Sequence, residues 1–581
     1  MKQRHVLFLF GPQVCVPEDP LAAARKMSLR TSVMAPEMPC GTASGFIDHF
    51  EKVETYRSDE IVRLAGKIHQ IQQIDAVVSY DDQGVPLAAR VAAALGLRGN
   101  PVPAADATRS KLLMKQHFDA AGVPIAEYSL VDGADGAAQW ANKWGYPVVI
   151  KPVSASASQG VIRANDEAEL RLAVRRLLKI VNGYGGESDS GHAVSFLIES
   201  YMPGSEISVE ILVTDGTPYV LCVFEKPQLL EGPYFEETIY VTPARLSGAV
   251  NRQVRELAVL ASNAIGLLQG PAHCEIRLTP DGPRVLEIAG RLIGGACSRA
   301  FRYALGEDIH FSILKCALGE SFEIPAQRPG CAAGAIMLPI PTEGILRVVR
   351  GLDVVGQLPG VRDVIMAVQP GQTIVPFPEQ SCYIGFVTAA GESTEDVVQT
   401  LNMARNSVLL ELDPIGCQTW ECEINSAQPD EQSHDWAVED LSRVSILQAR
   451  GIAAELLARA QFGEFSAEGA RQKARECLHQ LESGDCGATS PDYWLRSEGR
   501  GIIIGTHTKD TCSVACLAVL PQFRKTGVGQ VLVRALMVRF GRKGFRLINV
   551  DVDPRNMAAI AAYRSFGFSP VEGRDQTCCC R

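Results

Sequence analysis

Two glutamates in one short segment are the residues of this chain best placed to do chemistry. Residues 273–291 read HCEIRLTPDGPRVLEIAGR, in which a turn cluster between two apolar runs predicts a β-hairpin. A register symmetric about Asp281 sets Glu275 opposite Glu287 on one face. The same register pairs apolar neighbours on the other face, Cys274 with Ile288 and Ile276 with Leu286.

Two directly opposed carboxylates repel each other unless a cation lies between them. Oxygen ligands of this kind suit Mg²⁺, which keeps several waters and binds substrate phosphates. The hairpin therefore predicts a metal–nucleotide site at Glu275 and Glu287. The alternative interpretation is a surface hairpin with two solvated glutamates, since charged residues are mostly exposed.

Elements upstream of the hairpin carry further groups that suit a nucleotide. Lys111 opens an amphipathic helix, and Lys151 closes an apolar strand. Residues 154–160 (SASASQG) are small or flexible, so their backbone N–H groups can approach a phosphate closely. Glu199 and Glu206 follow on two strands joined by a Pro-Gly turn. This order of groups favours the nucleotide site over the solvated hairpin.

The order resembles the ATP-grasp ligases over about Asp106 to Gly295, and the span to about Glu423 resembles their L-amino-acid ligase and carboxylate-amine ligase branch. The resemblance implies ATP and Mg²⁺ as cofactors, and Arg291 as the catalytic contact to the transferred phosphate and the acyl phosphate. It implies that Lys111 and Lys151 hold the α- and β-phosphates. It further implies metal ligands at Glu275 and Glu287, a ribose contact at Glu206, and other ATP-binding positions at Ser154, Ser156, Ser158, Gly160, Glu199, Tyr201 and Met202.

Two positions depart from the resembling family. Ala289 stands where most ATP-grasp enzymes have an asparagine, although ligases that join two amino acids tolerate an alanine there. Glu237 matches a glutamate near the amino group of the substrate, but Tyr240 replaces the histidine expected three residues later. The choice of acceptor should differ accordingly. The alternative for Tyr240 is a strand aromatic packed in a sheet.

A second set of chemical groups lies near the other end of the chain. Residues 512–521 predict a buried strand that runs into an amphipathic helix. Gly527 and Gly529 at this junction expose backbone N–H groups at a helix N-terminus, which predicts a pyrophosphate site. The succession from about Trp494 to Glu572 resembles the GNAT acetyltransferases.

This second resemblance implies acetyl-CoA as a cofactor and Tyr563 as the general acid for the leaving thiolate, with helix packing as the alternative role of Tyr563. Residues 512–520 contain no acid, so a water, His507 or Asp551 could serve as the general base. The acetyl-CoA contacts implied are Leu517, Val519, Arg524, Lys525, Thr526, Gly527, Val528, Gly529 and Asn556.

Together the two signatures predict a bifunctional enzyme. The first three quarters of the chain would activate a carboxylate as an acyl phosphate and join it to an amine, giving ADP and phosphate. The last quarter would transfer an acetyl group to an amine of a small metabolite. The alternative is a ligase that uses another nucleophile, such as a hydrazine or a thiol, with the acetyltransferase-like part as a CoA-sensing or structural module.

Composition excludes several other classes. With a net charge of −10 the chain lacks the basic field that attracts nucleic acid. No apolar run approaches the roughly 20 residues that span a bilayer, and the N-terminal run is too short for a signal peptide, which predicts a cytoplasmic protein. The 17 cysteines are expected to be free thiols. Small-molecule substrates are the expected partners, and a homodimer is among the assemblies expected.

A chain of 581 residues is too long for a single core. The expected fold class is α/β and α+β multidomain, with an ATP-grasp fold after an open α/β layer and a GNAT fold at the end. The expected parts are an N-terminal subdomain (1–105), an ATP-grasp core (106–323, with a lid at about 140–200), a β-rich ligase subdomain (324–423), a linker (424–440) and a GNAT domain (441–575).

Overall fold

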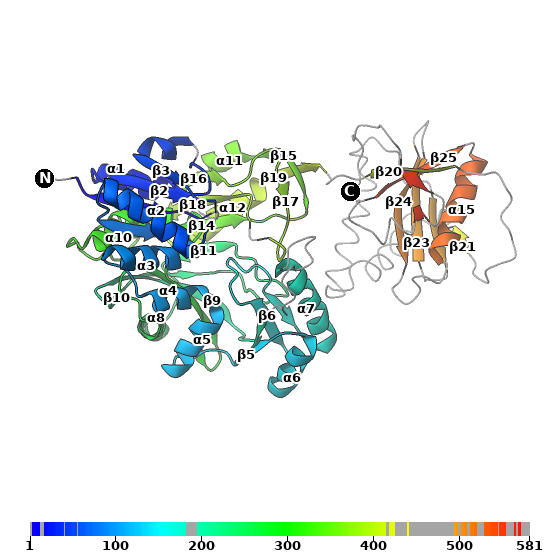
Figure 1. Ribbon diagram of the computed structural model, residues 1–581. Coiled ribbons are helices and arrows are strands. Elements are labelled where there is room, and N and C mark those ends of the chain that lie inside the picture. The colour runs from blue at the N-terminus through cyan, green and yellow to red at the C-terminus, as the bar shows by residue number, and fades with distance from the viewer. Residues whose placement is uncertain are drawn as a thin grey trace. The chain divides into compact units, whose positions relative to one another are not determined.

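The chain divides into two units in the computed structural model (Figure 1). One comprises residues 1–342 and 346–411, and the other comprises residues 343–345 and 412–581. In the part of the chain that the structure describes, no helix combines the length and hydropathy needed to cross a bilayer. The described residues are 3–11, 17–39, 41–54, 56–181, 195–380, 382–413, 418–423, 438–440, 493–497, 501–507, 512–519, 528–543, 545–552, 563–564 and 568–570.

The N-terminal subdomain is a four-stranded parallel sheet in the order β3-β2-β1-β4. Strand β1 buries every residue because both faces are covered. Val6 and Phe8 pack with the core under α1 and α10 (Ile309–Leu318), and Leu7 and Leu9 pack with the core under α2 and α3. The open α/β layer expected here is confirmed. Its elements are β1 (His5–Leu9), α1 (Glu18–Lys26), β2 (Arg30–Ala35), the 3-10 helix η1 (Gly41–Phe46), β3 (His49–Lys52), α2 (Ser58–Ile71), β4 (Ala76–Ser79) and α3 (Gly84–Leu95).

The loop after β4 is held by a buried carboxylate. Asp81 accepts hydrogen bonds from the backbone N–H groups of Gly11 at 2.5 Å, Gly84 at 2.9 Å and Gln83 at 3.0 Å. Such a loop at the carboxyl end of a parallel sheet is a frequent position for a ligand site. The next residue, Asp82, is thereby fixed at the edge of the cavity that the sheet supports.

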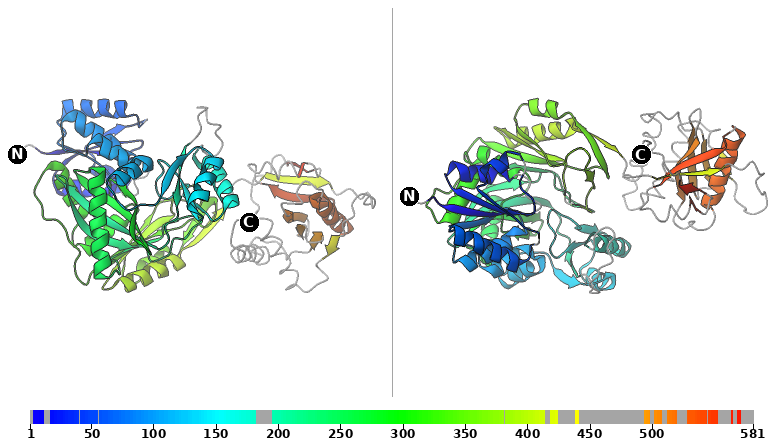
Figure 2. Two further views of the ribbon diagram at one scale, coloured as in Figure 1. Left: turned by 90° about the horizontal axis from the view of Figure 1, so that it is seen from below. Right: turned by 45° about the horizontal axis from the view of Figure 1, so that its top comes forward.

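The segment expected to be the lid contributes most of a four-stranded antiparallel sheet in the order β5-β8-β6-β7 (the lid sheet), and two helices pack against it. Figure 2 shows this sheet and its helices, in cyan, beside the larger central sheet, in green. The apolar residues of Val148–Pro152 and Phe196–Ser200 bury one face against these helices. The elements are β5 (Tyr128–Val131), α6 (Ala134–Trp144), β6 (Val148–Pro152), β7 (Ile162–Ala164), α7 (Glu167–Val181) and β8 (Phe196–Ser200).

The central sheet has eight antiparallel strands in the order β13-β12-β9-β10-β11-β14-β18-β16. Its strands are β9 (Ser205–Thr214), β10 (Thr217–Glu225), β11 (Ile239–Thr242), β12 (Gly270–Thr279), β13 (Gly282–Ala289), β14 (Ala332–Leu338), β16 (Val361–Met366) and β18 (Gly385–Gly391). The helices of this region are α4 (Val102–Arg109), α5 (Lys111–Ala120), α8 (Gly248–Ile265), α9 (Cys297–Ala304), α10 (Ile309–Leu318), α11 (Leu352–Gln357) and α12 (Thr394–Ser407).

Alternation along two neighbouring strands positions the polar groups of the site. On β9 the apolar residues Ile207, Val209 and Ile211 pack with the core that includes α8, so Glu206 and Glu210 take the opposite face. On β12, Cys274 and Ile276 join the same core. The residues that alternate with them, His273, Glu275 and Arg277, therefore share the opposite face.

The hairpin of β12 and β13 has most of the expected register. Cys274 pairs with Ile288 and Glu275 with Glu287, as predicted. The predicted pairing of Ile276 with Leu286 is wrong, because the register shifts after Glu275 and Ile276 pairs with Val285. Leu286 is the extra residue of a β-bulge, so the turn is one residue tighter than the symmetric register assumes.

The second unit contains a seven-stranded sheet in the order β21-β22-β23-β24-β25-β20-β26. Strand β20 pairs with β25 along its whole length, so its hydrogen bonds join it to this sheet and not to the ligase subdomain expected to end at residue 423. The elements are β20 (Gln418–Glu423), β21 (Val438–Asp440), β22 (Tyr493–Ser497), β23 (Gly501–His507), β24 (Cys512–Val519), α15 (Val528–Arg542), β25 (Leu547–Val552) and β26 (Ser569–Pro570). A three-stranded sheet contains β15 (Gly344–Arg350), β17 (Thr373–Ile374) and β19 (Leu409–Asp413).

Candidate active site

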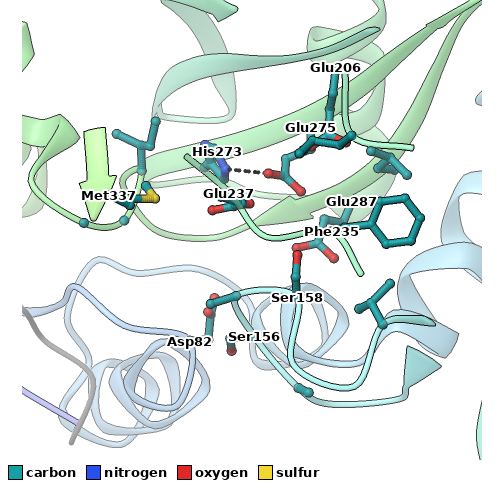
Figure 3. A pocket seen from close by; sticks show the side chains of 18 of the residues that line it. Asp82, Ser156, Ser158, Glu206, Phe235, Glu237, His273, Glu275, Glu287 and Met337 are labelled. Carbon is teal, nitrogen blue, oxygen red and sulfur yellow. Dashed lines mark ion pairs between the residues drawn. The ribbon is translucent and has the colours of Figure 1, made fainter. Parts of the chain in front are cut away.

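A cavity of about 500 Å³ lies among the lid sheet, the central sheet and the loop after β4 (Figure 3). It collects residues that lie far apart in the sequence, from Tyr80 to Phe386. Its lining includes charged groups, among them Lys111 and Lys151. Other lining residues are apolar or aromatic: Tyr80, Ile293, Met337, Met366, Tyr383 and Phe386.

Lys111 reaches the predicted metal pair from the first turn of α5. The side chain of Ser110 caps this helix by accepting from the backbone N–H of Leu113 at 3.4 Å. The backbone N–H of Lys111 donates to the carbonyl of Val153 at 2.9 Å, which ties the helix to the lid. Its Nζ lies 2.5 Å from Glu287 Oε2. The structure therefore brings together a lysine and a glutamate that are 176 residues apart.

Lys151 forms a second buried ion pair. Its Nζ lies 2.7 Å from Glu199 Oε1, because β6 and β8 are neighbouring strands of the lid. The same oxygen lies 3.4 Å from Lys115 Nζ. Burial lowers the pKa of Lys115 to about 8. Sequence reasoning missed Lys115, although a lysine four residues after Lys111 on one helix face was a usable signal.

The small-residue loop contributes only part of its predicted set. Ser156 and Ser158 line the cavity, but Ser154 and Gly160 are not among the lining residues. Gly160 has φ +70°, a backbone conformation that favours glycine, and a Cβ there would lie only 3.0 Å from the ring of Pro152. The loop is fixed to a distant segment, since the backbone N–H of Gly160 donates to Pro378 O at 3.1 Å.

The predicted ribose contact and two other predicted ATP-binding residues also reach the cavity. Tyr201, Met202 and Glu206 all line it. The guanidinium of Arg163 lies over the Tyr201 ring, 4.2 Å from its centroid. Glu206 is bound on both oxygens, since Arg277 Nε donates to Oε2 at 3.0 Å and the ammonium of Lys226 contacts Oε1. Arg277 and Lys226 were both missed; Arg277 was detectable as a neighbour of Glu275 on the same strand face.

Glu275 has three partners on a single oxygen. Its Oε1 lies 2.8 Å from Lys226 Nζ, 3.4 Å from the Tyr240 hydroxyl and 3.5 Å from His273 Nε2. Burial would raise the pKa of Glu275, but Lys226 and His273 hold it well below its usual range. With Glu287 directly opposite, each carboxylate keeps an oxygen for a divalent ion. The residues present therefore fit the metal that the hairpin predicts.

Behind Glu275 lies a buried histidine that the sequence reading did not single out. His273 Nδ1 lies 2.6 Å from Glu210 Oε1, and its Nε2 faces Glu275 (Figure 3). Burial lowers the pKa of His273, but the two glutamates raise it more, to about 10. The imidazolium is thus charged at neutral pH and orients a proposed metal ligand.

Arg291 is held by a bidentate ion pair. Its Nε and Nη2 donate to Asp82 Oδ1 at 2.9 Å and Oδ2 at 3.0 Å, across 209 residues of sequence. Burial would raise the pKa of Asp82, but Arg291 lowers it below its usual value. Asp82 was missed because nothing local to it indicates its partner. Both side chains line the cavity beside the lysines.

Tyr240 packs within the sheet and also lines the cavity. Its ring is buried and packs edge-on against Phe224, with centroids 6.5 Å apart, as a strand aromatic would. Its hydroxyl lies at Glu275, and the residue lines the cavity beside Glu237. Glu237 is also an ion-pair partner of Lys226, at 3.1 Å. Both residues predicted to contact the substrate therefore lie in one charged group with Glu275, the predicted metal ligand.

Family comparisons agree with this geometry. A model of the ATP-grasp domain matches residues 144–300. The chain contains an ATP-grasp domain. A model of the L-amino acid ligase C-terminal domain 2 matches residues 336–413, and one of the acetyltransferase (GNAT) family matches residues 484–568. The predicted succession of an ATP-grasp ligase and a GNAT domain is thereby confirmed.

Relatives of the ATP-grasp part share low identity with it over long spans. Alanine–anticapsin ligase of Bacillus subtilis (strain 168) is 24% identical over 387 residues, which cover 61% of this chain and 80% of that protein. Dapdiamide A synthase of Enterobacter agglomerans is 25% identical over 316 residues, which cover 54% of this chain and 66% of that protein. The crystal structure of L-amino acid ligase from Bacillus licheniformis has a TM-score of 0.63 at 24% identity, over 71% of this chain and all (100%) of that one, and shows the shared fold.

The GNAT domain is described only in part. Strand β24 carries Leu517 and Val519, and helix α15 begins at Val528 with Gly529 in its first turn, in the expected strand-to-helix order. The ring of Tyr563 packs edge-on against Phe568, with centroids 5.4 Å apart. The remaining predicted acetyl-CoA contacts lie outside the described residues: Arg524, Lys525, Thr526, Gly527 and Asn556.

Proposed function

We propose that the ATP-grasp part is a carboxylate-amine ligase that joins an amino acid to an amine through an acyl phosphate, with ADP and phosphate as products. The observation that carries this proposal is the pairing of Glu275 with Glu287, with Lys111 on one of them and Arg291 in the same cavity. The kinship with alanine–anticapsin ligase and dapdiamide A synthase supports an amide-forming reaction.

Phosphoryl transfer requires the protein to align the reacting groups and to neutralise charge on the phosphate oxygens. Glu275 and Glu287 would hold Mg²⁺, which supplies charge neutralisation at the phosphates. Lys151 would bind phosphate oxygens from the lid, and Lys111 would do so from α5. Lys111 pairs with Glu287 in this structure, so we infer that it turns to phosphate when the nucleotide arrives.

Arg291 would face the transferred phosphate and the acyl phosphate. Asp82 accepts from Nε and Nη2, and the Leu292 carbonyl accepts from Nη1, which leaves one N–H on each terminal nitrogen for the reacting groups. A preorganised cation of this kind stabilises the charge of the transition state without rearranging during the reaction. The lid would exclude water, which would otherwise hydrolyse the acyl phosphate.

The cavity also indicates the kind of carboxylate. Glu237 and Tyr240 would contact the amino group of the substrate. Apolar residues line another part of the cavity: Met337, Met366 and Phe386. An amino acid with an apolar side chain satisfies both parts. For the acceptor, the alternative to an amine is a different nucleophile, such as a hydrazine or a thiol. A scan of acceptors with one fixed carboxylate distinguishes an amine from these nucleophiles.

For the GNAT domain we propose transfer of an acetyl group from acetyl-CoA to an amine, with Tyr563 as the general acid. The match of residues 484–568 to the acetyltransferase family supports it. A domain that only binds CoA or supports the ligase is the alternative. Fusion in one chain raises the local concentration of any shared intermediate, which favours consecutive steps on one metabolite.

One experiment tests both activities. The purified full-length chain is incubated with ATP, Mg²⁺ and pooled amino acids, with and without acetyl-CoA, and the products are weighed by mass spectrometry. The proposal expects amino-acid-dependent ADP release and a condensation product that lacks one water, and a further acetylated mass when acetyl-CoA is present. ADP release that ignores every carboxylate offered would contradict the ligase proposal.

A further inference from the structure

One ammonium lies in the middle of three cavity-lining carboxylates. Lys226 follows the last residue of β10 and is only 5% exposed. Its Nζ contacts Glu206 Oε1 and lies 2.8 Å from Glu275 Oε1 and 3.1 Å from Glu237 Oε1. The three glutamates line the cavity, whereas Lys226 is not among the lining residues. The lysine therefore lies beneath the floor of the site.

Without the lysine, these carboxylates would form a site for a divalent ion. Single oxygens of Glu206, Glu237 and Glu275 lie within 4.8 Å of one another. They come from β9, from the segment before β11 and from β12. Oxygen-only ligands of this kind are the ones that hard cations such as Mg²⁺ and Mn²⁺ prefer. Three like charges at this spacing repel one another, so a cation among them stabilises their charged forms.

The surroundings of Lys226 match those of a permanently bound cation. An ammonium has three N–H donors, and each of the three glutamates offers one acceptor. The face of the Tyr240 ring covers a further side, with its centroid 4.7 Å from Nζ. The donors are satisfied within the protein, so they do not need a ligand from the cavity.

We propose that Lys226 is a resident cation that takes the place of a divalent ion among Glu206, Glu237 and Glu275 and so holds these three carboxylates toward the cavity. Lys226 is thus a positioning residue. The contacts of the three glutamates to ribose, substrate amine and metal rest on the proposed function, but the occupancy of the cluster by Lys226 does not.

The position of Lys226 limits where a divalent ion can bind. Oε1 of Glu275 is contacted by Lys226, Tyr240 and His273, which leaves Oε2 of Glu275 for an ion shared with Glu287. A divalent ion cannot enter the three-glutamate cluster while the ammonium occupies it. The chain should therefore take up its divalent ion together with the nucleotide, at Glu275 and Glu287, and not beforehand at the cluster.

The test is a Mn²⁺ titration of the full-length chain without nucleotide, with free Mn²⁺ followed by electron paramagnetic resonance. Lys226→Met should bind one additional Mn²⁺ per chain, and Glu237→Gln in the same background should remove it. Lys226→Arg keeps the charge and should behave as the unchanged protein. Lys115→Met is the matched control, since it removes the same charge from a buried lysine that contacts one carboxylate and not three.

Two results would overturn the proposal. The first is a folded Lys226→Met protein, judged by circular dichroism, that binds no additional Mn²⁺. The second is an unchanged protein that already binds a Mn²⁺ without nucleotide and loses it on Glu237→Gln, and this arm decides the matter if Lys226→Met does not fold. Because neither ATP nor substrate is present, failure of the ligase proposal leaves both results unaffected.

Discussion

The ion pair between Asp82 and Arg291 makes a prediction whose size can be worked out from its geometry. Both side chains are mostly buried, with 13% and 15% of their side-chain surfaces exposed, and two hydrogen bonds of 2.9 and 3.0 Å join them. Asp82→Asn keeps one acceptor oxygen and removes the charge, so it should lose one charge-assisted hydrogen bond. Such a bond contributes about 1.5–3 kcal/mol.

If that energy serves to hold Arg291 for the transition state, kcat should fall by about 10- to 150-fold, since about 1.4 kcal/mol corresponds to a factor of ten. KM for ATP should change less than kcat, because both ion-pair hydrogen bonds of Asp82 are made to Arg291. The assay is steady-state release of ADP with a saturating amino acid substrate. Thermal unfolding of the same samples separates loss of alignment from loss of fold.

Asp59→Asn is the control, because Asp59 pairs with Arg57 at 3.2 Å in a solvent-exposed position, where ion pairs contribute little. It should leave both kcat and stability unchanged. An Asp82→Asn protein with kcat within twofold of the unchanged chain would refute the reasoning. So would a kcat loss accounted for entirely by unfolded protein.

Three further predictions concern Lys151, His273 and Tyr563. Lys151→Met should raise KM for ATP about tenfold or more, as expected for loss of a charged hydrogen bond. Lys115→Met should raise it less, because Lys151 lines the cavity and Lys115 does not. Equal effects of the two substitutions in initial-rate measurements would contradict the phosphate contact proposed for Lys151. The pKa of His273 is raised to about 10, so its contribution to stability is fully present below about pH 6.5 and is lost as pH rises through 10. The difference in unfolding temperature between the unchanged protein and His273→Gln should therefore shrink from pH 6.5 to pH 10, and a constant difference would argue against a charged imidazole. Tyr563→Phe should slow acetyl transfer about 100-fold or more while CoA binding persists, as expected for loss of a general acid. An unchanged rate would contradict the role of general acid and would favour a packing role against Phe568.

The sequence predicted the elements of the site well because each has a local signature. Alternation of apolar and polar residues placed Glu275 and Glu287 on one face, and the helix start placed Lys111. The predicted pairing of Ile276 with Leu286 was wrong because a β-bulge, a local irregularity of the backbone, shifts the register. Apolar periodicity does not distinguish a bulged strand from a regular one.

Missed residues fall into two kinds. Arg277 and His273 share a strand face with Glu275, so alternation could have found them. Asp82 and Lys226 have no such signal: Asp82 meets a partner 209 residues away, and Lys226 meets carboxylates on three separate segments. Only the three-dimensional arrangement brings these groups together. The strand β20 illustrates the same limit, since its pairing with β25 follows a long gap in sequence.

The central claim is that Glu275 and Glu287 together hold a divalent ion that carries ATP. The most direct measurement is the affinity of the full-length chain for the Mn²⁺–ATP complex, followed by electron paramagnetic resonance and compared between the unchanged protein and Glu287→Gln. The account predicts one bound Mn²⁺ per chain that depends on ATP, and an affinity at least tenfold weaker in Glu287→Gln, about 1.4 kcal/mol or more. Equal affinity in the two proteins would contradict it.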